Sequence, residues 1–164
     1  MAVDAVLLSH DHHGDNLDDA GRALLPGAGV VLTTAAGARR LGGNARGLQP
    51  WATTQLEAPG RPTIQVTATP CRHGPPLSRP IVGEVIGCVR FPVTGPVRYS
   101  MTARDAVQLC RLVRPRTAIP VHYEGWTHFH QGRTTIEQEF QHAPADIGQR
   151  LKWLPIGASV TIAG

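Results

Sequence analysis

Apolar positions along the chain gather in short runs, and the spacing within each run predicts the element that it forms. Residues 3–8 are apolar enough for a buried strand, and residues 16–25 have helical spacing with acidic side chains in the first turn. Residues 30–34 have the pattern of a second strand, and Ala35–Leu41 that of a short helix that ends at two glycines. This order of strand, helix, strand and helix predicts helices layered against a sheet.

The middle of the chain has a less regular pattern. Residues 44–60 are predicted to form a loop that Trp51 anchors in the core. Residues 63–69 alternate between apolar and polar positions, which predicts a strand. Residues 81–91 predict a further strand that bends at its glycines.

The last third of the chain predicts helices that alternate with short extended stretches. One helix begins at Ser100 or Thr102, either of which can cap it, and runs to Val113. Its apolar stripe is expected to consist of Ala106, Leu109, Cys110 and Val113. A second helix is predicted over 134–143, and short strands are predicted at 117–121, 151–154 and 159–162. Together the elements predict a single domain of the α+β class over residues 1–164.

Composition agrees with one globular domain that is rich in turns. The chain has 164 residues, of which 41% are hydrophobic, and it contains 18 glycines and 14 prolines. Its three cysteines, Cys71, Cys88 and Cys110, lack C-x-x-C spacing, which argues against a disulfide framework and favours a reducing compartment.

Charge gives little support to a nucleic-acid partner. The formal net charge is +4, but Lys152 is the only lysine and the arginines are dispersed along the sequence. The first residues have no charged-then-apolar leader, and no apolar run approaches 18 residues. We therefore expect no membrane span and a cytoplasmic location.

The most distinctive stretch of the sequence is a cluster of histidines and aspartates directly after the first predicted strand. Three histidines and two aspartates stand between His10 and Asp15, and these side chains are the ones that hold zinc and similar cations. A strand end that leads into a helix is a usual place for such a site. The alternative is a polar turn in which Asp15 or Asn16 only caps the following helix.

Two further histidines follow predicted strands. His73 comes after the strand at 63–69, and His122 comes after the strand at 117–121. Each is a candidate metal ligand, and each has a structural alternative: a hydrogen-bonded loop histidine for His73 and a buried histidine for His122. Trp126 and His128 follow His122 and are candidates for substrate contact, with an exposed loop as the alternative.

The segment His10–Asn16 resembles the metal-binding loop of the metallo-β-lactamase superfamily, whose pattern is H-x-H-x-D-H after a hydrophobic strand. The longer segment Leu8–Asp18 is similar to the branch that contains ascorbate-6-phosphate lactonases and N-acyl-phosphatidylethanolamine phospholipases. The segment Val121–Trp126 resembles the last histidine motif of the same branch. This chain has one extra residue between the second histidine and the aspartate, and Asn16 stands where the superfamily has a histidine.

The resemblance implies an αββα-type sandwich that binds one or two zinc ions, with manganese or iron as alternatives. It implies as metal ligands His10, His12, Asp15, His73 and His122. Asp15 and His122, which belong to the second metal position, are also the implied catalytic residues. The implied reaction is attack of a metal-activated water on a small-molecule ester, lactone or phosphoester.

Relative to the resembled family, this chain is shortened. The first β-layer and the strand that carries a bridging aspartate have no counterpart, which indicates a deletion near 87–91. Loss of strands exposes sheet edges and favours self-association into a homo-oligomer. The alternative function is therefore a catalytically impaired remnant that binds metal or has only a structural role.

Overall fold

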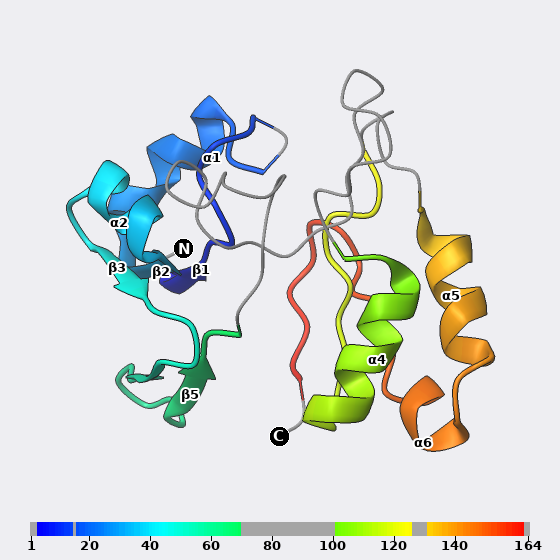
Figure 1. Ribbon diagram of the computed structural model, residues 1–164. Helices are drawn as coiled ribbons and strands as arrows, with labels where there is room; N and C mark the ends of the chain where they lie inside the picture. Colours follow the sequence, from blue (N-terminus) through cyan, green and yellow to red (C-terminus); the bar gives the residue numbers. More distant parts are fainter. Residues whose placement is uncertain (1–2, 15, 70–100, 126–130, 163–164) are drawn as a thin grey trace. The chain divides into compact units, whose positions relative to one another are not determined.

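The computed structural model describes residues 3–14, 16–69, 101–125 and 131–162. The chain divides into two compact units, Met1–Ile86 and Gly87–Gly164. Figure 1 colours their described residues from blue to green in the first unit and from green to red in the second. Because residues 70–100 lie outside the described ranges, the expected single domain and the deletion near 87–91 stay predictions, as does the strand at 81–91.

The N-terminal unit is built on a parallel three-stranded sheet. Strands β1 (Val3–Leu7), β2 (Ala28–Thr34) and β3 (Ala45–Leu48) lie in the order β1-β2-β3. Helix α1 (Asp19–Leu24) with the short 3₁₀ helix η1 (Leu25–Gly27) connects β1 to β2, and α2 (Ala35–Leu41) connects β2 to β3. Parallel strands end at the same edge of a sheet, so the residues that follow β1 and β2 meet there.

The central strand β2 carries the core of this unit. Val31 and Leu32 are 1% and 4% exposed, and consecutive residues of a strand point to opposite faces, so β2 is covered on both faces. Around Val31 pack Leu8, Leu17, Leu25 and Ala28. Gly47 on β3 lets this strand approach α2 closely, because a Cβ there would lie 2.5 Å from the Ala35 Cα.

The first predicted helix begins three residues later than its apolar spacing indicates. The cap is Asp18, whose carboxylate accepts a hydrogen bond of 2.7 Å from the Gly21 N–H. The Asn16 side chain is bonded elsewhere in the loop, so Asn16 does not cap α1. The N-cap is therefore Asp18, and not Asp15 or Asn16 as in the alternative of a polar turn.

Residues 44–60 are not the loop that the sequence predicts. They contain β3 and also β4 (Thr53–Leu56), which pairs antiparallel with β5 (Ile64–Thr67). Trp51 is 65% exposed and does not anchor the core. Its backbone is left-handed, with φ at 65°, and its N–H donates to the Ala68 carbonyl. This turn fixes the backbone of Trp51 and leaves its side chain at the surface.

The C-terminal unit contains the helices α4 (Ala103–Val113), α5 (Arg133–Gln141) and α6 (Ala145–Gly148). The predicted cap of α4 is confirmed as a reciprocal capping box between Thr102 and Asp105. The core of the unit consists of Val107, Cys110, Phe140 and Ile147.

Several predicted details of the C-terminal unit are wrong. Val113 is 52% exposed, and the buried residues of α4 are Ala103, Val107 and Cys110. Within the described ranges, the buried strand expected at 117–121 has one parallel bridge, between Ala118 and Leu151, and Val121 is 73% exposed. Helices and strands together confirm the α+β class. None of the helices in the described ranges has the length and apolar character needed to cross a bilayer.

A candidate metal-binding loop after strand β1

The histidine cluster lies where the sequence predicts it, at the carboxyl end of β1. The Leu8 N–H donates to the Leu32 carbonyl at 2.8 Å, which extends the pairing of β1 with β2 by one residue. His10 follows two residues later and is 1% exposed, so its imidazole is enclosed by protein. The loop therefore presents a buried imidazole at the edge where β1 and β2 end.

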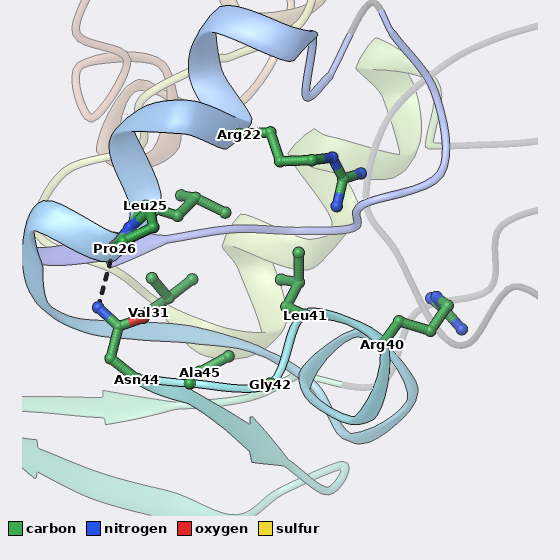
Figure 2. Close-up of a pocket in the computed structure, with 10 residues that line it drawn as sticks. Arg22, Leu25, Pro26, Val31, Arg40, Leu41, Gly42, Asn44 and Ala45 are labelled. Carbon is green, nitrogen blue, oxygen red and sulfur yellow. Dashed lines mark hydrogen bonds between the residues drawn. The ribbon is translucent and has the colours of Figure 1, made fainter.

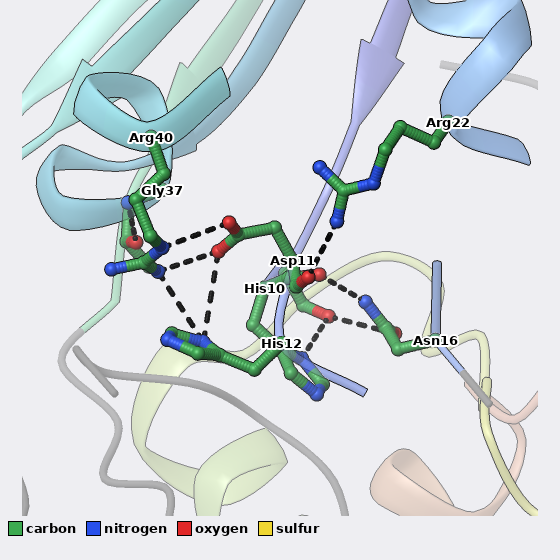
Figure 3. Close-up of polar contacts among 9 residues, drawn as sticks. His10, Asp11, His12, Asn16, Arg22, Gly37 and Arg40 are labelled. Carbon is green, nitrogen blue, oxygen red and sulfur yellow. Dashed lines mark hydrogen bonds and ion pairs between the residues drawn. The ribbon is translucent and has the colours of Figure 1, made fainter. Parts of the chain in front are cut away.

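Two arginines fix the residue beside His10. The Arg40 guanidinium donates to the Asp11 carboxylate, from Nε to Oδ2 at 2.9 Å and from Nη2 to Oδ1 at 2.5 Å. Arg22 donates to the Asp11 backbone carbonyl at 2.9 Å. Figure 3 shows Arg40 reaching Asp11 from α2 and Arg22 reaching it from α1. Both helices that cover the sheet therefore hold the loop at one residue.

The charge of Arg40 keeps Asp11 ionised. Burial alone raises the pKa of this carboxyl, because Asp11 is 6% exposed. The hydrogen bonds and positive charge of Arg40 outweigh burial, so the pKa of Asp11 lies below its ordinary value. In turn, the hydrogen bonds to Asp11 raise the pKa of Arg40. The pair is a charged crosslink between the loop and α2.

His12 lies beside this crosslink. Its Nδ1 is 3.3 Å from Arg40 Nη2 and 3.6 Å from Asp11 Oδ1. A guanidinium can only donate, so the Arg40 contact is a hydrogen bond only when Nδ1 accepts and the neutral ring carries its proton on Nε2. Ligation of a metal through Nε2 therefore requires Nδ1 to exchange Arg40 for Asp11 as its partner.

Asn16 closes the loop on itself. Its side-chain NH₂ donates to the His10 carbonyl, and its Oδ1 accepts from the Ser9 hydroxyl at 3.2 Å. The same Ser9 oxygen is 3.0 Å from His10 Nδ1. Asn16, which stands where the resembled superfamily has a histidine, is thus a structural crosslink of the loop in this chain.

His13 completes the group of imidazoles in the loop. Its ring centroid lies 5.7 Å from that of His10 and 6.4 Å from that of His12. Its carbonyl accepts the N–H groups of Asn16 and Leu17, each at 2.9 Å, which forms the turn before α1. The structure therefore brings three imidazoles of one loop close together, including one that the sequence pattern did not assign as a ligand.

Of the remaining predicted site residues, only His122 lies in the described ranges. Outside the described residues lie Asp15, His73, Trp126 and His128. His122 belongs to the C-terminal unit. Within the ranges 3–14, 16–69, 101–125 and 131–162, no three His, Cys, Asp or Glu side chains form a group that could hold a metal ion.

His122 has an unusual backbone. Its φ is 64°, in the left-handed region, where a side chain with a Cβ is strained. The next residue, Tyr123, packs edge-to-face on Trp153 with ring centroids 4.7 Å apart, and the Arg133 guanidinium lies 4.8 Å from the Trp153 ring centroid. This aromatic packing holds the side chain of the residue directly after His122.

A pocket of about 400 Å³ adjoins the loop. Figure 2 shows its apolar lining, which includes Leu25, Val31 and Leu41, together with the side chains of Arg22 and Arg40. Asn44 borders it and donates to the Leu25 and Ala28 carbonyls, at 2.9 and 2.7 Å. Both arginines that line the pocket also bond to Asp11, so the pocket shares its polar groups with the loop.

The sequence matches no protein-family model, and no curated protein matches it.

The residues that hold the loop were not among the predicted site residues. Asp11 occupies a spacer position in the H-x-H pattern, and its partner Arg40 lies 29 residues further along the chain. A single sequence gives no signal for such a pair. Ser9 and Asn16 are seven residues apart within the motif itself, but their bond depends on the turn at His13.

Proposed function

We propose that this protein is a metal-dependent hydrolase of the metallo-β-lactamase type, acting on a small-molecule ester, lactone or phosphoester. The metal ligands in this proposal are His10, His12, Asp15, His73 and His122. The proposal rests on the ordered histidine motifs of the sequence and on the arrangement of the loop after β1.

The observation that carries the proposal is the environment of His10. An imidazole that is 1% exposed at the end of a parallel strand has lost its hydration, which costs free energy unless bonds replace it. The loop that bears it is fixed by crosslinks to α1 and α2 through Arg22 and Arg40. Such support on rigid elements is what a binding site requires and what an exposed polar turn does not need.

The donor set fits zinc by its chemistry. Imidazole nitrogen and carboxylate oxygen are the ligand types of catalytic zinc sites, which use three protein ligands and keep one position open. Held in this way, zinc lowers the pKa of a bound water and polarises a carbonyl or phosphoryl oxygen. His10 and His12 supply two of the imidazoles from the described part of the chain.

The remaining groups of the loop orient these ligands. Asp11, kept ionised by Arg40, has its Oδ1 3.6 Å from His12 Nδ1. It can accept a hydrogen bond from a protonated Nδ1 once the Arg40 contact shifts. A carboxylate behind a ligating imidazole fixes its ring and raises its basicity.

Hydrolysis assays test this function. The purified chain is assayed with generic carboxylic esters, lactones and phosphodiesters, with added zinc or manganese. We expect metal-dependent turnover that is lost in His12→Ala and in His73→Ala and is kept in His142→Ala, a change at an exposed histidine of α5's C-cap. Equal background rates for the wild type and all variants would contradict the proposal and favour the catalytically impaired remnant.

A further inference from the structure

The loop after β1 contains a chain of hydrogen bonds whose direction can be worked out from the donors and acceptors alone. It runs from the His10 carbonyl to the Asn16 amide, from the amide to the Ser9 hydroxyl, and from the hydroxyl to the His10 ring. The chain thus begins and ends at His10.

The first bond fixes how the Asn16 amide is turned. A backbone carbonyl can only accept, so the Asn16 atom that faces the His10 carbonyl must be the NH₂ group. The oxygen of the amide, Oδ1, then faces the Ser9 hydroxyl at 3.2 Å. Because Oδ1 can only accept, Ser9 is the donor in this bond.

The second bond fixes the proton of His10. Ser9 has a single hydroxyl hydrogen, and its donation to Asn16 leaves only lone pairs toward His10 Nδ1, which lies 3.0 Å away. The contact is a hydrogen bond only if Nδ1 carries the proton and donates it to Ser9. In the opposite tautomer, Nδ1 and Asn16 Oδ1 are both acceptors, and Ser9 has only one hydrogen to donate. One of these two atoms would then face the Ser9 oxygen with no hydrogen between them.

We infer that Asn16, acting through Ser9, holds His10 in the tautomer that is protonated on Nδ1 and has its lone pair on Nε2. This is the tautomer that a metal ion bound through Nε2 requires. Asn16 is thus a positioning residue for His10. Its use in preparing a metal ligand rests on the proposed function, whereas the tautomer itself does not.

The tautomer is measured directly on the full chain without added metal. Long-range ¹H–¹⁵N correlation spectra of the ¹⁵N-labelled protein near pH 8 distinguish the two neutral tautomers, and His10→Gln identifies the His10 signals by their loss. We expect His10 to carry its proton on Nδ1 in the wild type. In Asn16→Ala the Ser9 hydroxyl is released to donate to Nδ1, so the His10 proton is expected on Nε2.

Asn44→Ala provides a matched control. Asn44 is also an asparagine of the N-terminal unit whose amide donates to backbone carbonyls, those of Leu25 and Ala28. It lies outside the hydrogen-bond chain, so its variant is expected to lose stability while His10 keeps the proton on Nδ1. Proton on Nε2 in the wild type, or an unchanged tautomer in Asn16→Ala, would overturn the inference.

A zinc titration followed by calorimetry separates this inference from the proposed function. If both hold, Asn16→Ala binds zinc about 10-fold more weakly than the wild type, the size of effect seen when a ligand's hydrogen-bond partner is removed. A wild type that binds no zinc but shows the Nδ1 tautomer would contradict the function and leave the role of Asn16 intact. Zinc affinity that is equal in the wild type and in Asn16→Ala would contradict that role.

Discussion

Arg40 on α2 holds the carboxylate of Asp11 with two hydrogen bonds, of 2.9 and 2.5 Å, across 29 residues of sequence. Asp11 is 6% exposed, and Arg40 is the cation that neutralises it in this contact. The pair joins the histidine loop to the sheet's helical layer. It therefore governs both the stability of the N-terminal unit and the order of the candidate site.

Removal of Arg40 is expected to destabilise the protein strongly. Arg40→Met leaves a buried carboxylate without its cation, which lowers the free energy of unfolding by about 3 kcal/mol. Urea unfolding followed by circular dichroism measures the loss. Arg39→Met, at an exposed neighbour on the same helix, is the control and should change the free energy by less than about 0.5 kcal/mol. Equal effects of the two substitutions would show that the crosslink does not stabilise the fold.

The same pair predicts how stability depends on pH. Because the folded protein lowers the pKa of Asp11 below its ordinary value of 3.8, the stabilisation is complete above pH 3.8 and disappears as the pH falls through the folded-state pKa. At pH 7 the wild type should exceed Asp11→Asn by about 2 kcal/mol in free energy of unfolding. Urea titrations at lower pH values should show this difference shrinking; a difference that is constant with pH would refute the assignment.

The capping box predicts a moderate effect in the C-terminal unit. The Thr102 hydroxyl accepts from the Asp105 N–H at 3.1 Å, and the Asp105 carboxylate accepts from the Thr102 N–H at 2.9 Å. Thr102→Ala should lower the free energy of unfolding by about 1 kcal/mol. The comparison is Thr134→Ala on α5, an exposed threonine that does not cap a helix. The cap would be irrelevant to stability if both variants unfolded at the same urea concentration.

Cys110 is expected to be an unreactive thiol. Cys110 is 6% exposed. Burial raises the pKa of its thiol by more than the charge of Arg150 lowers it, so the pKa lies above its ordinary value. Since the thiolate is the nucleophile, alkylation by iodoacetamide in a Cys71→Ser/Cys88→Ser protein should be much slower for folded than for urea-unfolded chains. The raised pKa also means that stability declines as the pH rises above 9.0. Equal alkylation rates in the two states would contradict this account.

Strong periodic patterns and capping residues made much of the fold predictable. The strand at 3–8, the helix Ala35–Leu41 and the Thr102 cap are confirmed because short-range chemistry determines them. Strand β3 was missed because its sequence, ARGL, has no apolar alternation and is held by pairing with β2. The stretch at 117–121 has the apolar pattern of a buried strand, but among the described residues it bridges Leu151 alone.

The candidate site was predictable in its location and not in its support. His10 and His12 are at the end of β1 because the apolar run before them forms a strand. Their orientation depends on Arg40 and Asn16, whose contacts follow from the tertiary fold and from one tight turn. Asp15, His73, Trp126 and His128 stay predictions because they lie outside the described residues.

Elemental analysis shows whether the loop after β1 is part of a metal site. Elemental analysis of the purified full chain compares the wild type with the double variant His10→Ala/His12→Ala, and His142→Ala serves as the control at an exposed histidine. We predict about one or two zinc-like ions per chain in the wild type and in the control, and their loss in the double variant. A folded, monodisperse wild type that holds no metal after exposure to zinc would refute the proposed metal-dependent function.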